Sequence, residues 1–279
     1  MTITNTIATI TNPAVRHDFV IVMRGELCNP NGDPNAGNAP RQLPDNRVYT
    51  TGTSLSSRIN QTAELLYGAK VLYKHGTNLD EVQKQYDTPT ALMTDFWDRR
   101  GNGGLFASYG KDKKNAIEVG FRGIYRLYPM VSLEVPNLVE QAITSPTTNS
   151  KGKRTMGNAT YADRVVARGT GTYNACLNIK RGNTVDAEYM GQWLVCLWQH
   201  PIMTASLQRG EWEIVDVVIA THNNAYGNLQ LSKVDGLVTV EGNGVVSVAD
   251  APEGITITRL SDVIDDLTVA YPPTIAQAS

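Results

Sequence analysis

The residues of this chain that could do chemistry are concentrated in one loop near the N-terminus. The loop reads CNPNGDPNAGNAPRQLPDN over residues 28–46, and Asp33 is its most conspicuous carboxylate. A carboxylate there could hold a metal ion or act as a base in RNA cleavage. Asp33 also stands in the turn sequence N-G-D-P, where a carboxylate bonds its own backbone ahead of a proline. We favour the turn, because no second acid, histidine or lysine lies beside it.

Other catalytic patterns are missing from the sequence. It contains no phosphate-binding G-x-x-x-x-G-K-[ST] segment, no dinucleotide fingerprint and no G-x-S-x-G nucleophile elbow. Its four histidines lack metal-ligand spacing, so we expect neither a metal nor a cofactor. The three cysteines are widely spaced and are expected to be buried and reduced, which fits the cytoplasm. The protein is therefore expected to bind rather than to catalyse.

Positive charge is concentrated in one segment, although the whole chain has a net charge of −2. Residues 143–181 carry seven lysines and arginines against a single acid, Asp163, whereas residues 182–279 carry three basic residues and twelve acids. Such a basic segment can provide a track for a polyanion on one face of the molecule. The alternative is a solvated loop that happens to be basic. The acidic C-terminal third is not expected to touch nucleic acid.

Segments of β-branched and aromatic residues must supply the strands that position the loop. They comprise residues 17–28, 47–51, 117–135, 164–180, 211–221, two segments flanking a turn at 241–244, and 254–260. Residues 144–160 are small, polar and basic, and should form a protruding, mobile hairpin or loop. Residues 101–115 are expected to be a loop or web, and residues 1–15 a loose arm.

Two amphipathic segments are predicted to form helices that pack on these strands. The first is capped by Thr53 or Ser54 and runs to about Tyr67. The second begins near residue 186 and ends at His200-Pro201. Residues 78–100 are expected to be partly helical. The order strand, helix, strands, insertion, strand, helix, strand is typical of an α+β, ferredoxin-like sheet that carries insertions.

Length and composition fit one large soluble domain. The chain has 279 residues, of which 41% are hydrophobic and 19% charged, as in globular proteins rather than disordered or fibrous ones. No apolar run is long enough to span a bilayer, and the N-terminus lacks the basic start of a signal peptide. We therefore expect a single cytoplasmic domain over residues 1–279 with no membrane contact.

The first loop resembles a motif of a known family, the backbone subunits of Cascade, the effector complexes of type I CRISPR systems. Those proteins begin with a strand, then N-P-N-G-D-P, then N-x-P-R; here the motif comprises Asn29 to Pro34, with Asn38, Pro40 and Arg41. Two weaker resemblances follow in family order. They are Arg154-Thr155-Met156-Gly157 after a variable insertion, and residues 221–228 after the last core strand. The pattern is most similar to the type I-C and I-B variants.

The resemblance implies a palm with an RNA-recognition-type (RRM-like) fold and a thumb-like hairpin. The palm would cover about 16–75, 117–135 and 164–240, the helical or web insertion about 76–116, the thumb about 136–163, and a C-terminal β extension about 237–279. Copies would stack head to tail along one guide RNA (crRNA). Each thumb would flip a base out, so that the other bases pair with target DNA.

The resemblance also implies partners. They are the crRNA, the target DNA strand through the guide, further copies of the chain in a helical filament, and the other Cascade subunits: the one that caps the RNA 5′ end, the large subunit and the small subunit. The acidic C-terminal third is expected to face a basic surface of the next copy, with Glu211 and Asp216 at that contact.

A protein that reads the RNA backbone needs cations along one track, because the phosphates carry the charge. Arg41 leaves the Asn- and Gly-rich loop where backbone amides could also face phosphate. Met156 could wedge between bases or simply anchor the hairpin, and Arg24 could point to the other face of the sheet. The residues expected to contact RNA are Arg16, Arg24, Asn31, Gly32, Asn38, Arg41, Arg58, Lys151, Lys153, Arg154, Met156 and Arg164.

Two other functions are compatible with the sequence. A type III-like backbone subunit would cleave target RNA through Asp33 in a Mg²⁺-dependent reaction. A filament or virion protein, suggested by the Thr-, Asn- and Gly-rich arm and loops, would assemble without any RNA. The basic segment at 151–168 counts against this structural alternative.

Overall fold

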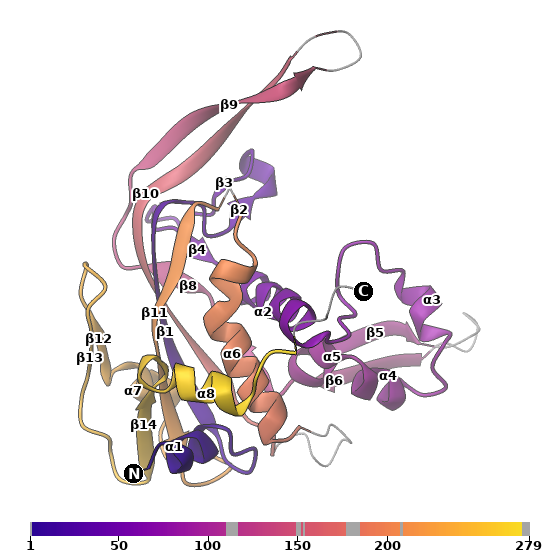
Figure 1. The fold of residues 1–279 in the computed structure, drawn as a ribbon, viewed down its shortest axis with the longest axis vertical. Coiled ribbons are helices and arrows are strands. Elements are labelled where there is room, and N and C mark those ends of the chain that lie inside the picture. Colours follow the sequence, from indigo (N-terminus) through magenta and orange to yellow (C-terminus); the bar gives the residue numbers. More distant parts are fainter. Residues whose placement is uncertain are drawn as a thin grey trace.

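The computed structural model describes residues 2–109, 117–148, 152, 154–176, 185–206 and 209–274. At its centre is an antiparallel sheet in the order β14–β11–β1–β10–β8–β4, with β7 and β9 also paired to β10 (Figure 1). Its strands are β1 (His17–Cys28), β4 (Tyr49–Thr50), β7 (Tyr125–Leu127), β8 (Met130–Ser132), β9 (Leu138–Thr148), β10 (Arg154–Tyr173), β11 (Glu211–His222) and β14 (Ile255–Arg259). The large antiparallel sheet combined with helices confirms the expected α+β class.

Strand β1 lies inside this sheet and is buried on both faces. It pairs with β10 on one side and β11 on the other, so that His17 lies opposite Tyr173 and Thr221, and Cys28 opposite Ala162. Successive strand side chains point to opposite faces. Phe19, Ile21 and Met23 accordingly pack in one hydrophobic cluster, and Val20 and Val22 in another.

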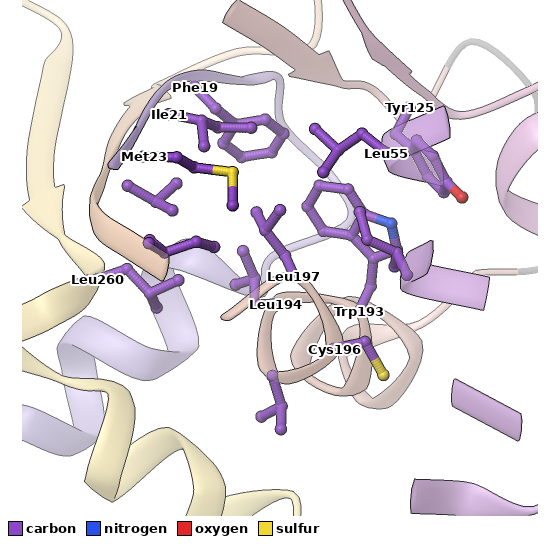
Figure 2. Close-up of a cluster of buried hydrophobic side chains, with 14 of the residues drawn as sticks. Phe19, Ile21, Met23, Leu55, Tyr125, Trp193, Leu194, Cys196, Leu197 and Leu260 are labelled. Atoms are coloured by element: carbon purple, nitrogen blue, oxygen red, sulfur yellow. The ribbon is translucent and has the colours of Figure 1, made fainter. Parts of the chain in front are cut away.

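Helices α2 (Gly52–Tyr67) and α6 (Ala187–Met203) cover one face of the sheet. Figure 2 shows Trp193, Leu194 and Leu197 of α6 directed toward the side chains of β1. The Trp193 ring centroid lies 5.4 Å from that of Phe19 and 4.8 Å from that of Tyr125. The elements β1, α2, β8, β10, α6 and β11 follow one another in the β-α-β-β-α-β order.

Both helices have boundaries that differ from the sequence prediction. The N-cap of α2 is Thr51 rather than Thr53 or Ser54, and its hydroxyl accepts a hydrogen bond from the Ser54 N–H at 3.1 Å. Helix α6 continues past His200-Pro201 to Met203. Pro201 cannot donate to the Leu197 carbonyl, but Nδ1 of His200 contacts that oxygen at 2.6 Å. The histidine side chain therefore replaces the missing backbone donor.

The opposite face is covered by a hairpin of β12 (Val238–Val240) and β13 (Val246–Val248), next to α7 (Leu231–Asp235). The predicted C-terminal β extension is only partly β. After β14 the chain forms the 3₁₀ turn η4 (Leu260–Asp262) and helix α8 (Ile264–Ala270), because Ile264 and Leu267 pack into the helical side of the core.

Asp216 on β11 is also placed differently from the prediction. It is fully buried, and its carboxylate accepts hydrogen bonds from the backbone N–H of Ser261 at 3.3 Å and from Nε of Arg259 at 2.5 Å. This carboxylate therefore holds the β14–η4 connection to the sheet. It is not available for a contact between copies.

The N-terminal arm and the insertion contain more regular structure than predicted. Residues 3–10 form helix α1 (Ile3–Ile10), whose Ile10 is buried in the core. The insertion comprises α3 (Leu79–Gln83), α4 (Pro89–Asp95), α5 (Trp97–Asn102) and the paired strands β5 (Gly103–Tyr109) and β6 (Ile117–Arg122). Residues 103–109 are thus a strand rather than a loop, since Phe106 and Tyr109 pack with Leu72 and Leu92 in a separate small core.

A long hairpin projects from the sheet in Figure 1. Strand β9 pairs with the first part of β10, from Arg154 opposite Thr148 to Ala162 opposite Leu138. Strand pairing thus extends well outside the 144–160 segment whose composition indicated a hairpin or loop. None of the helices formed by the described residues is both long and apolar enough to cross a membrane.

Candidate nucleic-acid interface

The loop that follows β1 is held in one shape by its own asparagines. The side-chain amide of Asn29 donates to the Asn38 carbonyl at 2.6 Å, and the N–H of Asn38 donates to the Asp33 carbonyl at 2.8 Å. Gly37 and Asn38 have φ angles of 59° and 64°, which glycine and asparagine tolerate. The short strands β2 (Gly32–Asp33) and β3 (Ala39–Pro40) close the loop. It is an ordered surface, and we call residues 29–41 the Asn loop.

Asn31 connects the Asn loop to the start of helix α2. Its side-chain oxygen accepts hydrogen bonds from both the N–H and the hydroxyl of Thr51, each at 3.2 Å. Thr51 is the N-cap of α2, so the same residue caps the helix and, through its bonds to Asn31, holds the Asn loop against it. The positive end of the helix dipole is thereby held beside the loop, which favours anions in this region.

Arg41 leaves the Asn loop with its guanidinium partly exposed. Its side chain is 27% accessible, and Nη1 lies 3.8 Å from an Asp33 carboxylate oxygen. Its Nε is shielded from solvent and has no hydrogen-bond partner among the described residues. A shielded N–H without an acceptor costs about 1–3 kcal/mol. A phosphate oxygen can reach only the exposed part of this guanidinium, where Nη1 has a long contact to Asp33.

Asp33 has a structural role in the Asn loop. Its side chain accepts a hydrogen bond from the Asn35 N–H at 3.0 Å and caps the 3₁₀ turn η1 (Pro34–Ala36). This is the turn geometry that the N-G-D-P sequence predicts. In the part of the chain that the structure describes, histidine, cysteine, aspartate and glutamate side chains form no group of three that could hold a metal ion.

Arg58 is expected from the sequence to contact RNA, but its side chain is buried. It is 5% exposed on α2, and its guanidinium donates to the Pro30 carbonyl beneath the Asn loop. Burial, and then the charge of Arg209, lowers the pKa of Arg58 to about 10, so the group is still charged at neutral pH. Arg58 therefore supports the loop from behind and adds positive potential without reaching its surface.

Arg24 and Arg164 lie apart from the Asn loop. Both are exposed, and they line a cleft whose other residues include Glu26, Glu211 and Glu213. Arg24 forms an ion pair with Glu213. The carboxylates offset the two cations, so this cleft is less selective for anions than the loop.

Arg16 lies at the far end of β1 from the Asn loop. Its guanidinium donates to both carboxylate oxygens of Asp18, at 2.9 and 2.8 Å. The structure thus brings together Asn31, Gly32, Asn38 and Arg41, with Arg58 behind them. It leaves Arg16 a strand's length away.

Of the remaining predicted contacts, Arg154 and Met156 belong to the β9–β10 hairpin. Lys151 and Lys153 lie outside the described residues. The backbone of Arg154 and Met156 forms the start of β10, where Met156 pairs with Thr144. The hairpin carries these positions away from the sheet (Figure 1).

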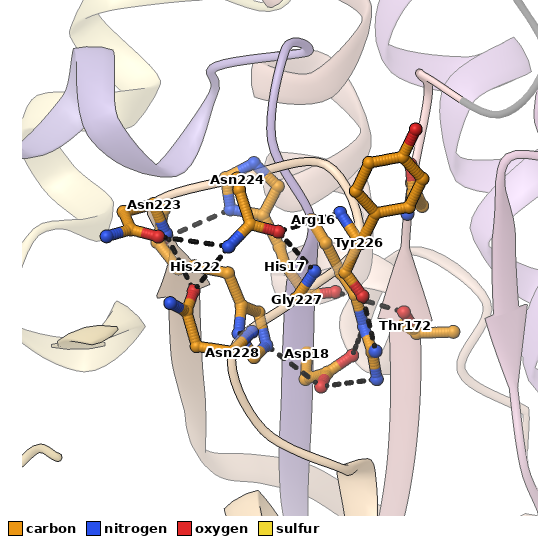
Figure 3. Close-up of polar contacts among 12 residues, drawn as sticks. Arg16, His17, Asp18, Thr172, His222, Asn223, Asn224, Tyr226, Gly227 and Asn228 are labelled. Atoms are coloured by element: carbon orange, nitrogen blue, oxygen red, sulfur yellow. Dashed lines mark hydrogen bonds and ion pairs between the residues drawn. The ribbon is translucent and has the colours of Figure 1, made fainter. Parts of the chain in front are cut away.

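The segment at 221–228 forms a polar network with the beginning of β1 (Figure 3). His222 lies 3.1 Å from Asp18 through Nε2, while its Nδ1 accepts from the Asn228 N–H at 2.8 Å. Burial alone would raise the pKa of Asp18, but hydrogen bonds from His222 and Arg16 outweigh it and lower this pKa. Burial also lowers the pKa of His17 to about 4. These hydrogen bonds join the start of β1 to the segment that follows β11, at the end of the sheet opposite the Asn loop.

The sequence reasoning missed two residues of the Asn-loop site, Asn29 and Thr51. Asn29 is 5% exposed, and its amide fixes Asn38. Its position at the strand end, next to a proline, is a signal for such a capping role. The role of Thr51 depends on Asn31, twenty residues earlier in the chain, and local spacing carries no signal for it.

The substitution Gly32→Ala is expected to weaken RNA binding about tenfold. A Cβ at residue 32 would lie 2.0 Å from the Asn38 side-chain oxygen and 2.9 Å from its carbonyl, so the loop must shift. Misplacing one charged hydrogen bond is worth about 1.5–3 kcal/mol. Fluorescence anisotropy with a labelled guide RNA would measure the loss. The control is Gly236→Ala, where the nearest atoms are 3.5 Å away; equal binding by both variants would contradict the expectation.

Comparison with known proteins gives the following. A family model described as "CRISPR-associated protein Cas7" matches residues 15–260. Among curated proteins no significant match is found. A solved structure described as "CRISPR RNA-guided surveillance complex, pre-nicking" is similar, with 13% identity and a TM-score of 0.45 over 74% of this chain and 76% of that chain. A second, described as "CRISPR RNA-guided surveillance complex", has 11% identity and a TM-score of 0.46 over 93% and 86%.

Proposed function

The chain belongs to the CRISPR-associated protein Cas7 family, and on that premise we propose that it is a guide-RNA-binding backbone subunit of a Cascade-type complex. In this proposal the protein is not catalytic. It reads the backbone and shape of the crRNA, while base pairing by the guide supplies sequence specificity toward target DNA.

The observation that carries this proposal is the environment of Arg41. An ordered loop holds a partly exposed guanidinium, whose Nη1 lies 3.8 Å from an Asp33 carboxylate oxygen, beside the capped start of a 16-residue helix. Arginine recognises phosphate through several donors in a fixed geometry. One RNA phosphate would bind the exposed donors of this guanidinium. Asn31, Gly32 and Asn38 would shape the surrounding surface.

Buried positive charge behind the Asn loop supports the same site. Arg58 is charged and buried, and Arg209 lies near enough to lower its pKa. The backbone of Arg209 also joins the loop, since its carbonyl accepts from the Asn29 N–H at 2.9 Å. These cations strengthen the attraction for a polyanion through their charge, without contacting it directly.

The sheet, the insertion and the β9–β10 hairpin each have a role in this function. The sheet with α2 and α6 is the RRM-like palm, residues 76–116 are the insertion, and the β9–β10 hairpin is the thumb. Arg154 and Met156, with Lys151 and Lys153, would act on the RNA from this thumb, Met156 as a wedge between bases. Further copies would stack head to tail along the guide. Glu211, which is exposed, is the acidic candidate for that contact in place of Asp216.

Extraction of nucleic acid from the protein after co-expression with a CRISPR array tests this function. We expect a discrete guide RNA in a large particle that contains several copies of the chain. A particle of the same size without nucleic acid would instead indicate a structural filament. Mg²⁺-dependent cleavage of a complementary RNA at regular spacing, lost in Asp33→Ala, would indicate the type III-like alternative. Either of these results would overturn the proposal.

A further inference from the structure

A second cleft with an excess of positive charge lies at the opposite end of the central sheet from the Asn loop. It encloses about 310 Å³, at the lower end of the range of ligand pockets. Three arginines line it, Arg16, Arg122 and Arg126, and no carboxylate does. Arg16 and Tyr226 lie at the start of β1, whereas Tyr128, which lines the same cleft, lies beside Gly52, the first residue of α2.

The arginines of this cleft differ in how far their charge is offset. Arg16 is bound to Asp18. Arg126 is exposed, and its side chain has no ion pair or hydrogen bond with any described residue. Two other clefts pair arginine with carboxylates, Arg24 with Glu213 and Arg164 with Asp163 among their lining residues. The cleft at Arg126 is therefore the stronger site for an anion.

An exposed aromatic ring stands at the edge of this cleft on a rigid support. Tyr226 is 84% exposed. The side chain of Asn224 holds the loop beneath it, since its oxygen accepts from the N–H groups of Tyr226 at 2.9 Å and Gly227 at 2.8 Å. Asn174 also donates to the Ala225 carbonyl at 2.7 Å. Figure 3 shows the Tyr226 ring standing clear of these hydrogen bonds.

We propose that this cleft binds single-stranded nucleic acid, with one base stacked on Tyr226 and phosphates on Arg122 and Arg126. Aromatic rings next to cations are the usual means of binding single strands without sequence preference. Tyr128, which is 43% exposed and lines the same cleft, provides a second ring. Tyr226, Arg122 and Arg126 are not among the residues of the proposed guide track, so this site goes beyond the proposed function.

A second copy of the chain is the other occupant to consider. In protein interfaces an aromatic residue that contributes strongly to binding is surrounded by other contacts that exclude water. Around Tyr226 the lining combines the polar side chains of Arg16, Thr172 and Asn174 with apolar and aromatic surface, and no closed ring of apolar side chains surrounds the 84% exposed Tyr226 among the described residues. An exposed aromatic ring near Arg126, which has no ion pair with any described residue, matches a base and its phosphate better than a protein surface.

Fluorescence anisotropy of the full-length protein with a labelled 15-nucleotide oligothymidine tests the proposal. Tyr226→Ala should weaken binding about 5- to 150-fold, because stacking of one base is worth about 1–3 kcal/mol. Tyr226→Phe should bind as the unmodified protein does. Arg126→Glu should weaken binding and flatten its dependence on salt. Lys70→Glu, at an exposed pair with Asp95, is the matched charge control and should have no effect.

The same substitutions should be repeated with Arg41→Glu present, so that the two sites are read separately. Because distant sites act independently, Tyr226→Ala should cause the same fold-loss in both backgrounds, even if Arg41→Glu itself changes nothing. Photo-crosslinking of a bromouracil-containing oligonucleotide should label the peptide that contains Tyr226. Unchanged binding by correctly folded Tyr226→Ala and Arg126→Glu would overturn the proposal. So would variants that lose only self-association, which would assign the cleft to a second copy.

Discussion

Reversing the charge of Arg41 is expected to eliminate guide RNA from the purified particle. Each copy would lose one charged hydrogen bond, worth about 1.5–3 kcal/mol, and would place an additional negative charge beside Asp33 and the phosphate. Because several copies share one RNA, these losses multiply along the strand. For a single copy the expected loss of affinity is about tenfold to a hundredfold.

The dependence on salt separates a phosphate contact from a general disturbance of the fold. Removing one contact should reduce the slope of log affinity against log salt concentration by about 0.7 per copy on a single strand. Arg41→Lys keeps the charge but loses the planar donor set. Its RNA affinity should therefore lie between those of the unmodified protein and Arg41→Glu. Lys70→Glu, which reverses an exposed charge just beyond the C-terminal end of α2, should retain the RNA. Retention of normal amounts of RNA by Arg41→Glu would contradict the proposed track.

Acidification from pH 7.5 to 5.0 is expected to lower the free energy of unfolding by about 4 kcal/mol through two buried histidines. Burial is the main cause that lowers the pKa of His17 to about 4 and that of His200 to about 3. Below the unfolded-state value of about 6.5, the unfolded chain takes up protons that the folded chain does not. The stabilisation is thus complete above pH 6.5 and is lost as the pH falls toward the folded-state values. Each histidine contributes about 2 kcal/mol of this loss at pH 5.

Urea unfolding at the two pH values measures this effect. His200→Gln should reduce the difference between pH 7.5 and 5.0 by about half, whatever its cost at pH 7.5. His75 is exposed, and His75→Gln should leave the difference unchanged. Asp18 has a lowered pKa and becomes protonated only at more acidic pH, so it does not contribute in this window. A pH-independent unfolding energy would show that the two histidines are accessible to protons in the fold.

The elements that local pattern could identify are the ones predicted correctly. Strand β1 and helices α2 and α6 have continuous or periodic apolar residues, and those patterns determine which side is buried. The Asn loop was recognised by its turn residues, and the turn role of Asp33 is confirmed by its hydrogen bond to Asn35. Each of these features depends on neighbours only a few residues away in the chain.

The features that the sequence did not predict depend on partners far away in the chain, except for the burial of Arg58, which helical spacing indicates. Thr51 caps α2 because Asn31 bonds it from another element, and His200 allows α6 to continue through Pro201. Strand β5 exists because β6 pairs with it. The burial of Arg58 could have been predicted, since it lies three residues after Leu55 and four before Thr62, both on the buried face of the helix.

The central position of β1 also determines the order in which a newly made chain can complete its sheet. Its two partners are β10, which ends at Tyr173, and β11, which ends at His222. At about 5–20 residues per second, the ribosome takes about 7 to 30 s to make the 145 residues between Cys28 and Tyr173. During that time a strand with five consecutive apolar residues, at positions 19–23, has neither of its neighbours. The central sheet therefore closes only late in synthesis, after β10 and then β11 have been made.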